Sequence, residues 1–532
     1  SGDPVEYGKD VVFTAEPNEG YRVKAWKSDG STLGETGNSY TLENLQAAAT
    51  VTVVFELIPK YTVTYDGNGS TGGTVPIDNN KYEEGKPVTV LGETDPPTQT
   101  GYDFAGWNTA ADGSGTSYAA GKTFTMGTAD VTLYAQWAIA DFAADINEVF
   151  GTTATFTWSL ALEATSIEIQ QKVGEGAWEK ATTLGELSLD ATTAVVTKLD
   201  KDTTYQFKLL VTGGTTAGGS NPIPVTTKAA VMYGASWDSS KSSTSMTRLG
   251  DAIEADNSGF VGYFDNYAPW NGMKLCNVEG QVMVKIPKFY YKHTYKGGVH
   301  QFWVADGPLE TEEFALHPAF MRAEEKECIY MGAYKASFDT KITETVTVKG
   351  ENGKDETLIV NALASVSGAL PAVQKKRYEF RASAKARGAN WCIVDALARN
   401  AVALLYLVEY ADTNSQATIG AGVTDFTNTA AIASGGCDYL NGASGNAVGD
   451  VGKVSVSYRG LEDLWGNVWE FVDGINIKCS DKEPYIADDN SKFADDTFMG
   501  VYTSSGITLP ADNGYVKDFA CSAKADWLLM PT

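Results

Sequence analysis

The sequence predicts a multidomain protein in which small all-β modules precede one larger α+β domain. The chain has 532 residues, and because a domain usually takes about 100–200 residues, we expect several separate cores. Alternating apolar and polar residues, which indicate half-buried strands, dominate up to residue 229, whereas the one long helical pattern lies beyond residue 390. The predicted boundaries are 1–58, 59–137, 138–229 and 230–532.

The first two modules are related by an internal repeat. Residues 20–26 (GYRVKAW) are echoed by 101–107 (GYDFAGW), and each is followed by a β-rich run. Short alternating runs and the turn sequence DGNG at 66–69 predict small all-β units with their aromatic side chains in the core. With its YDGNG opening, GYDFAGW centre and YAQW ending, the segment 61–137 closely resembles the internalin-type B-repeat of bacterial surface proteins. Residues 1–58 resemble a divergent copy that lacks the opening strand.

The third module is expected to be a β-sandwich. Several short runs with period-2 alternation occur between residues 138 and 229. Trp158 on an early strand and Tyr205, six positions after Leu199 and placed to cap a corner through its hydroxyl, resemble a fibronectin type III domain. The sequence has no R-G-D motif, so we expect this domain to act as a spacer.

The remaining residues predict a compact core under long loops. Residues 281–291 and 327–337 are expected to be strands. Residues 391–411 predict a buried helix, because they are apolar on nearly every side apart from Asp395, Arg399 and Glu409. The segments 417–445 and 475–508 are rich in Gly, Ser, Asn, Thr and Asp, which is typical of functional surface loops.

The segment 458–474 (YRGLEDLWGNVWEFVDG) is the most informative stretch of the chain. Its glycines permit a tightly wound backbone, and its large rings are costly to leave in water. We therefore expect a buried loop with a polar lining, in which the structural residues are Trp465, Gly466, Asn467, Trp469 and Phe471.

This loop resembles the loop of the C-type lectin-like fold in its formylglycine-generating-enzyme branch, whose motif is G-N-V-W-E followed by Trp or Phe. That branch includes phage tail proteins and the variable ligand-binding proteins of diversity-generating retroelements. Further resemblance lies in the stretches MYGASW (232–237), TRLGD (247–251), HPAF (317–320) and DWLLMPT (526–532). The resemblance implies a C-type lectin-like, ligand-binding domain over about residues 230–532.

The resemblance also implies a calcium ion at this loop. In the resembled enzyme the ion would take oxygens from Asp463, from the carbonyl groups of Gly466 and Val468, and from Glu470. Such a set suits Ca²⁺, which binds carboxylate and carbonyl oxygens. The alternative is a loop closed by internal hydrogen bonds, in which Glu470 accepts from backbone N–H groups.

The binding surface itself is expected in the loops near the end of the chain. In the resembled variable proteins, ligand contacts follow a stretch like 526–532, and the apolar run 527–530 has no partner strand after it. We therefore expect the protein to continue past Thr532. The border of the surface is predicted at Tyr485, Asp488, Asp489, Asn490, Asp495 and Asp496.

Catalysis is not expected. The formylglycine-generating branch uses a close pair of cysteines downstream of the tryptophan loop, whereas here Cys479 and Cys521 follow it far apart. The 6 cysteines form no C-x-x-C pair and do not cluster in sequence with the 3 histidines, so zinc and redox motifs are not predicted. We expect buried thiols, with disulfides left open, and a structural His317 before Pro318. The alternative function is an exported formylglycine-generating-enzyme-like oxidase tethered by accessory modules.

Charge and hydropathy restrict the partners. The net charge of −26 would repel nucleic acid and anionic membranes, and no apolar run approaches the roughly 18 residues that span a bilayer. The predicted partner is a cell-surface glycan or a protein receptor. We expect an extracellular protein, displayed on a phage tail fibre or on a bacterial surface, and a homotrimer if it belongs to a phage fibre.

Overall fold

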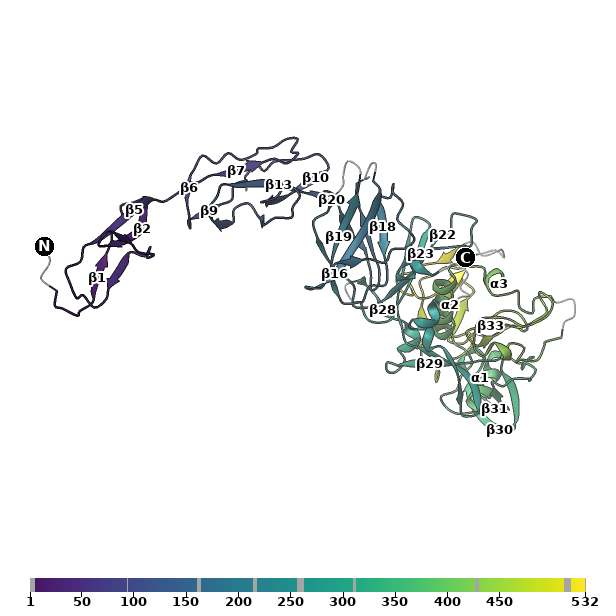
Figure 1. The fold of residues 1–532 in the computed structure, drawn as a ribbon. Helices are drawn as coiled ribbons and strands as arrows, with labels where there is room; N and C mark the ends of the chain where they lie inside the picture. Colours follow the sequence, from purple (N-terminus) through teal and green to yellow (C-terminus); the bar gives the residue numbers. More distant parts are fainter. Residues whose placement is uncertain are drawn as a thin grey trace.

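A computed structural model describes residues 5–92, 94–159, 164–213, 218–255, 263–309, 312–425, 430–510 and 518–531. These residues form β-rich modules that follow one another along a curved path and end in a larger terminal domain (Figure 1). Within the described residues, α-helices occur in the terminal domain alone: α1 (Arg377–Lys385), α2 (Ala396–Tyr410) and α3 (Ser415–Thr418). The prediction of a multidomain chain with all-β modules at its start is confirmed.

The first module is built on a three-stranded sheet, β3-β2-β5, and a two-stranded sheet, β1-β4. Trp26 is 3% exposed, and its Nε1 donates to the carbonyl oxygen of Gly37 at 2.9 Å, which anchors the small core. The strands are β1 (Val11–Thr14), β2 (Tyr21–Ser28), β3 (Ser31–Thr32), β4 (Ser39–Leu42) and β5 (Val51–Leu57).

The second module repeats this plan, but its main sheet has one more strand and it adds the two-stranded sheets β12-β9 and β6-β8. Its main sheet has the order β11-β10-β13-β7, in which β7 pairs parallel with β13. The first module has no described strand in the place of β7, which agrees with the expected missing opening strand. The strands are β6 (Lys60–Tyr61), β7 (Val63–Asp66), β8 (Tyr82–Glu83), β9 (Pro87–Thr89), β10 (Tyr102–Asn108), β11 (Ser117–Tyr118), β12 (Thr123–Thr125) and β13 (Val131–Ile139).

The internal repeat extends to the irregularities of the backbone. The pairing of β2 with β5 shifts register between Val23 and Ala25, and that of β10 with β13 shifts between Phe104 and Gly106, at corresponding places in the repeat. Trp107, the counterpart of Trp26, is 1% exposed. A β-bulge bends a strand and re-aims its side chains, so the shared bulge turns both tryptophans into their cores.

The third module is a sandwich of two sheets, β14-β15-β18 and β17-β16-β19-β20, with β21 also paired to β19. Trp158 is buried, and the Tyr205 hydroxyl accepts from the backbone N–H of Asp200 at 2.9 Å, as the predicted corner requires. The strands are β14 (Ala143–Val149), β15 (Ala154–Thr157), β16 (Ser166–Val173), β17 (Glu179–Lys180), β18 (Thr193–Val196), β19 (Thr204–Thr212), β20 (Gly218–Gly219) and β21 (Ile223–Thr226).

A buried carboxylate joins the sandwich to the terminal domain. Asp251 accepts hydrogen bonds from the backbone N–H groups of Gly151 (3.1 Å), Thr152 (2.6 Å) and Met232 (2.7 Å). Its side chain is 0% exposed, and burial raises the pKa of its carboxyl group. Phe150 packs against Trp303 beside it. The sandwich is therefore docked on the terminal domain and not merely linked to it.

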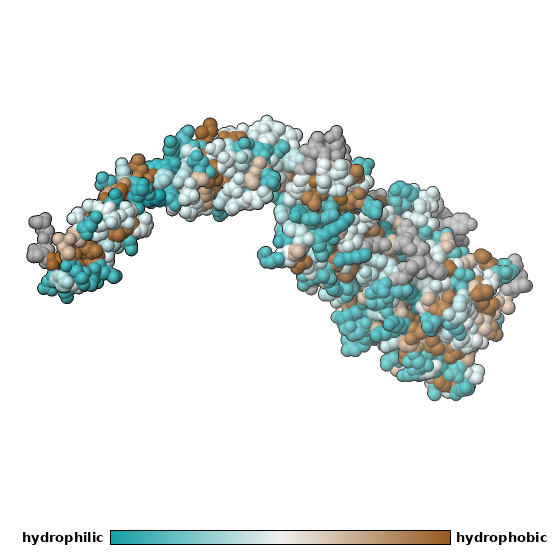
Figure 2. All heavy atoms as spheres, viewed as in Figure 1, coloured by the Kyte–Doolittle hydropathy of each residue, from teal (hydrophilic) through white to brown (hydrophobic). Residues whose placement is uncertain are grey.

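The terminal domain contains a five-stranded sheet, β23-β22-β27-β26-β28, and several smaller sheets, with α2 packed against β22 and β27. Figure 2 shows hydrophobic residues on the visible face of this domain, around the region where Figure 1 places α1. Its strands are β22 (Met232–Asp238), β23 (Thr247–Gly250), β24 (Lys274–Val278), β25 (Gln281–Pro287), β26 (Tyr290–Lys296), β27 (Val299–Ala305), β28 (Ala315–Leu316), β29 (Cys328–Gly332), β30 (Ser337–Lys349), β31 (Asp355–Ala364), β32 (Gly445–Asn446), β33 (Val456–Tyr458), β34 (Leu461–Glu462), β35 (Ile475–Lys478), β36 (Glu483–Ile486), β37 (Thr503–Ser504), β38 (Phe519–Ala520) and β39 (Met530–Pro531).

The predicted strands of this domain are real but shorter than expected. The run 281–291 divides into β25 and β26, and β25 ends at Pro287, which has no N–H to continue a ladder. The run 327–337 contains β29 and only the first residue of β30.

The predicted buried helix starts later than its apolar pattern suggests. Asp395 caps α2 by accepting from the N–H of Ala398 at 2.9 Å, so residues 391–394 precede the helix. Glu409 is 2% exposed and pairs with Arg459, which explains a charge in a buried helix. The helix α1 was not predicted.

The apolar end of the chain is covered. Trp527 is 9% exposed and Leu528 is 0% exposed, and both pack in the core of the terminal domain. The run therefore has its partner surface in the core and in β38, which precedes it in the chain and pairs with β39. Continuation past Thr532, which lies outside the described residues, stays a prediction. No helix within the described ranges is long and apolar enough to cross a membrane.

Candidate ligand-binding site

The tryptophan loop is held by its own backbone geometry and by Asn467. Gly466 has φ +81°, and a Cβ there would lie 2.7 Å from the Val423 nitrogen, so no other residue fits without strain. The Asn467 side chain accepts from the N–H of Ile432 (3.0 Å), and its Nδ2 donates to the Ile432 carbonyl (3.1 Å) and to Asp463 (2.9 Å). These contacts fix the loop against the segment around residue 432.

The carboxylates predicted to bind calcium have protein partners. Asp463 is 1% exposed and accepts from Asn467, from Ser455 Oγ (3.1 Å) and from the N–H of Val456 (3.3 Å). Burial raises the pKa of its carboxyl group. Glu470 pairs with Lys335 at 3.3 Å and Arg399 at 3.7 Å. The Asp463 contacts are those of an internally closed loop, whereas the partners of Glu470 within the described residues are cations and not backbone N–H groups. The calcium site stays a prediction.

The expected burial of all three rings of the loop is wrong. Trp465 is partly buried and donates from Nε1 to the carbonyl of Gly420 at 2.9 Å. Trp469, however, is 100% exposed, and Phe471 is 47% exposed. A fully exposed indole gains nothing from folding, so it is a candidate contact residue for a ligand.

Trp469 stands at the rim of a hollow of about 190 Å³. A volume of this size is below the roughly 300–1,000 Å³ of drug-sized sites, and it suits one side chain or one sugar ring. The Lys335–Glu470 ion pair lies in the lining and offers both donors and acceptors. The aromatic residues of the lining are Tyr334, Phe380, Trp391, Trp469 and Phe471.

The residues predicted to border the binding surface do not gather at one site. Asn490 hydrogen-bonds the side chain of Cys392, which lines the hollow, so this residue lies beside it. Asp489 closes a local turn with Ser491 and Lys492, and the ring of Tyr485 packs on Phe498.

The acidic border residues have three different environments. Asp488 is exposed and lines a second hollow near Trp527, and Asp496 is exposed. The prediction of Asp495 as a residue of the binding surface is corrected by the structure. Asp495 is 8% exposed and accepts from Arg377 Nε (2.7 Å) and Arg381 Nη2 (2.8 Å). Its carboxylate neutralises two arginines and is not presented to solvent.

Sequence reasoning missed most of the hollow's lining. Tyr334, Phe380 and Trp391 come from segments far apart in the chain, and no local motif marks them. The fold also places His293, His300 and Cys521 within reach of one another, although they do not cluster in sequence. Burial lowers the pKa of both imidazoles. The 6 cysteines are all free thiols, and Cys392, Cys479 and Cys521 are exposed, contrary to the expectation of buried thiols.

Comparisons with known protein families find similarities at the start of the chain. Residues 61–136 match the Listeria-Bacteroides repeat domain, and residues 1–59 match the divergent InlB B-repeat domain. A protein of Evansella cellulosilytica named "Putative Gly-rich membrane protein" is 38% identical over 154 residues, which cover 26% of this chain and 17% of that protein. A "Putative membrane protein" of the same organism is 34% identical over 134 residues, 25% of this chain and 19% of that protein. The chain thus spans under a fifth of these relatives.

Two solved structures match part of this chain, but their TM-scores are too low to support any statement about its fold. A crystal structure of titin domains shares 13% identity and covers 43% of this chain and 96% of its own, at a TM-score of 0.14. The FN1-FN3 domains of chicken CNTN1 share 10% identity and cover 42% of this chain and 96% of their own, at a TM-score of 0.15. The family matches cover the first two modules, so residues 1–59 and 61–136 are similar to B-repeat domains.

Proposed function

We propose that the protein is a surface-displayed binding protein. Its B-repeats and its fibronectin type III-like sandwich form a stalk, and the terminal domain, which we assign to the C-type lectin-like fold, grips a cell-surface glycan or a protein receptor. The end-to-end order of the modules supports the stalk, and the B-repeat matches support display outside a cell (Figure 1). A phage tail fibre and a bacterial surface are both suitable carriers.

The observation that carries the proposal is the exposed Trp469 beside its aromatic hollow. An indole face stacks on a sugar ring or fills a pocket of a partner protein, and such an anchor commonly contributes more than 1 kcal/mol to binding. The ring of Phe471 packs near Phe380, with 6.1 Å between centroids, so the hollow has a fixed wall. Lys335 and Glu470, which line the same hollow, offer a hydrogen-bond donor and an acceptor to a bound ligand.

The contact between the sandwich and the terminal domain supports binding because it holds the terminal domain in place. Lys201 pairs with Asp306 at 2.9 Å, and Lys228 pairs with Glu312, so charges at the edge of the Asp251 contact also bridge the sandwich and the terminal domain. A head held at a fixed angle loses less orientational freedom on binding than a head on a loose linker. Several copies side by side would add avidity without new contacts.

The test is binding by the full chain to bacterial cells, purified cell-wall polysaccharides and a glycan array. Trp469→Ala should weaken binding at least about tenfold, which corresponds to 1.4 kcal/mol. Val448→Ala, at a residue 88% exposed outside the hollow, is the matched control and should bind as the wild type does. Equal binding by wild type and Trp469→Ala would contradict the proposed site.

The same samples test the absence of catalysis and the oligomeric state. We propose binding without turnover, so the bound glycan or a thiol-containing peptide should keep its mass after prolonged incubation. Oxidation of the peptide thiol would instead favour the formylglycine-generating type of function. A trimeric mass in sedimentation analysis would support a phage fibre.

A further inference from the structure

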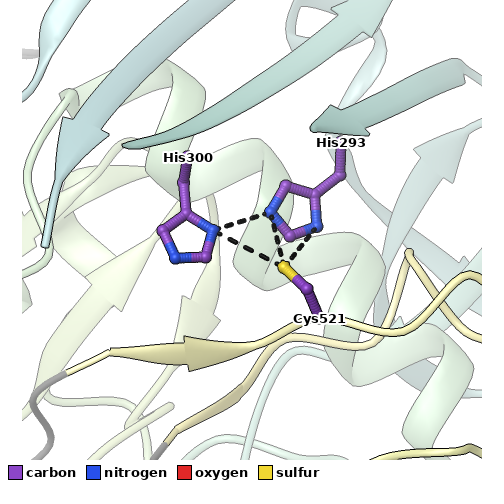
Figure 3. A group of neighbouring side chains, drawn as sticks. All are labelled: His293, His300 and Cys521. Carbon is purple, nitrogen blue, oxygen red and sulfur yellow. Dashed lines mark hydrogen bonds between the residues drawn. The ribbon is translucent and has the colours of Figure 1, made fainter. Parts of the chain in front are cut away.

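Three side chains of types that bind transition metals, those of His293, His300 and Cys521, point toward one another (Figure 3). His293 on β26 lies opposite Phe302 on β27, and His300 is two residues from Phe302, so the two imidazoles share one face of the hairpin. Cys521 follows β38. His293 Nε2 lies 3.0 Å from His300 Nδ1, and the Cys521 Sγ lies 3.6 Å from the former and 3.7 Å from the latter.

The hydrogen bonds of the two rings fix their tautomers. His293 Nδ1 lies 2.8 Å from the carbonyl oxygen of Asp526, which can only accept, so this nitrogen carries the proton. His300 Nε2 lies 2.6 Å from Asp518 Oδ1, a carboxylate oxygen, and it carries the proton for the same reason. In the neutral rings, His293 Nε2 and His300 Nδ1 are therefore both unprotonated lone pairs, and they face each other.

Two facing lone pairs repel unless a metal ion or an additional proton on one of the rings lies between them. A tetrahedral zinc ion with the usual bond lengths places two imidazole nitrogens about 3.3 Å apart and each nitrogen about 3.6 Å from a thiolate sulfur. The observed separations of 3.0 Å between the nitrogens and 3.6 and 3.7 Å to the sulfur are close to this geometry. The sulfur also lies 4.0 Å from His293 Nδ1, so the Cys521 side chain has to shift toward the Nε2 lone pair when a metal binds. The arrangement also follows the common pattern in which a ligating histidine donates its other N–H to a carboxylate or carbonyl.

We propose that His293 Nε2, His300 Nδ1 and Cys521 Sγ form a binding site for a divalent transition metal, with zinc as the first candidate. Two imidazoles and one thiolate are borderline and soft ligands, which select zinc-like ions over Ca²⁺ and Mg²⁺. The thiol releases its proton to solvent when the metal binds. The three ligands leave a fourth position for water or a ligand group, on the side where Cys521 is exposed.

The surroundings suit a metal with one open side. His300 is 0% exposed, and Phe302 and Trp237 stack on it while Phe519 meets it edge-on. Apolar walls of this kind exclude water and strengthen a metal site. Because Cys521 lies 221 positions from His300, the bound ion would clamp the C-terminal segment to the β26–β27 hairpin. This role is independent of the ligand-binding function proposed above.

The experiment uses the full chain, stripped with a chelator and dialysed, and titrated with Zn²⁺ or Co²⁺ in excess Ca²⁺. We expect one tightly bound zinc ion per chain, and with cobalt a near-ultraviolet thiolate-to-metal absorption band. Cys521→Ser should abolish that band, and both Cys521→Ser and His293→Gln should weaken zinc binding at least about tenfold. Cys479→Ser, at another exposed thiol, is the control and should change neither result.

A second measurement avoids variants altogether. In the wild-type chain, zinc should protect Cys521 from alkylation while leaving Cys479 reactive, as read by mass spectrometry of the two peptides. Any one of three results would overturn the site. The wild type could show no cobalt band, Cys521→Ser could bind zinc as tightly as the wild type, or zinc could leave the alkylation of Cys521 unchanged.

Discussion

His317 makes the stability of the terminal domain depend on pH. Its ring is 0% exposed and packs against Phe289 and Phe320, with centroids 5.1 and 6.2 Å away. Its Nδ1 accepts from the N–H of Ala319 at 3.2 Å, which requires an unprotonated Nδ1. Burial lowers the pKa of this imidazole to about 3. The folded domain therefore holds His317 neutral over a range in which the unfolded chain would protonate it.

The sign and size of the effect follow from this shift. A group whose folded pKa is depressed contributes stability that is complete above its unfolded pKa of about 6.5 and is lost as the pH falls. Each pH unit between about 6.5 and the folded pKa costs about 1.4 kcal/mol, so two units cost about 2.7 kcal/mol. We expect His317 alone to lower the free energy of unfolding by that amount between pH 6.5 and pH 4.5.

The assay is urea unfolding of the full chain at both pH values, followed by tryptophan fluorescence. His317→Asn keeps a side-chain acceptor at the start of the turn η5 (Pro318–Phe320) but does not titrate. The variant should be less stable at pH 6.5, because ring packing is lost, and its own decrease on acidification should be smaller than that of the wild type by about 2.7 kcal/mol. Equal decreases for the two proteins would refute the reasoning.

Two further predictions concern the junction and the tryptophan loop. Asp251→Ala leaves two buried N–H groups and one partly buried N–H group without their acceptor, so it should destabilise the docked pair by about 3 kcal/mol and speed proteolysis near residue 151. The control Glu175→Ala, at an exposed site, should change stability by no more than about 0.5 kcal/mol. Unchanged proteolysis of Asp251→Ala would exclude the clamp. Gly466→Ala should lower the free energy of unfolding by about 3 kcal/mol, as measured by thermal unfolding, because φ is +81° and the added Cβ meets the backbone of Val423. The control Gly500→Ala has a similar φ of +73° but nothing within 4 Å of the added Cβ, so it should lower the free energy of unfolding by about 1 kcal/mol. Equal losses for the two variants would show that the close approach is unimportant.

Local features of the fold were predictable where neighbouring residues carry them. The repeat of Gly20–Trp26 in Gly101–Trp107 predicted two related modules, and Tyr205 predicted its own corner contact. The hairpin that carries His293 and His300 could also have been predicted from the sequence. A Gly-Gly pair favours a two-residue hairpin turn, and Gly297 and Gly298 both have positive φ in that turn, which fixes the register of the two strands. That signal would have placed both histidines on one face.

The sequence by itself determined the modular order, the small aromatic cores and the strained glycine of the tryptophan loop. The order and the cores depend mainly on residues close in the chain, where turn chemistry and side-chain alternation act directly. For Gly466 the sequence indicated only the need for a glycine, and the close approach to Val423 comes from the tertiary structure. Only the tertiary structure decided that Trp469 is exposed, that Asp495 is buried under two arginines, and that Cys521 meets the two histidines. Exposure and ligand geometry depend on which distant segments pack together, and no local pattern contains that information.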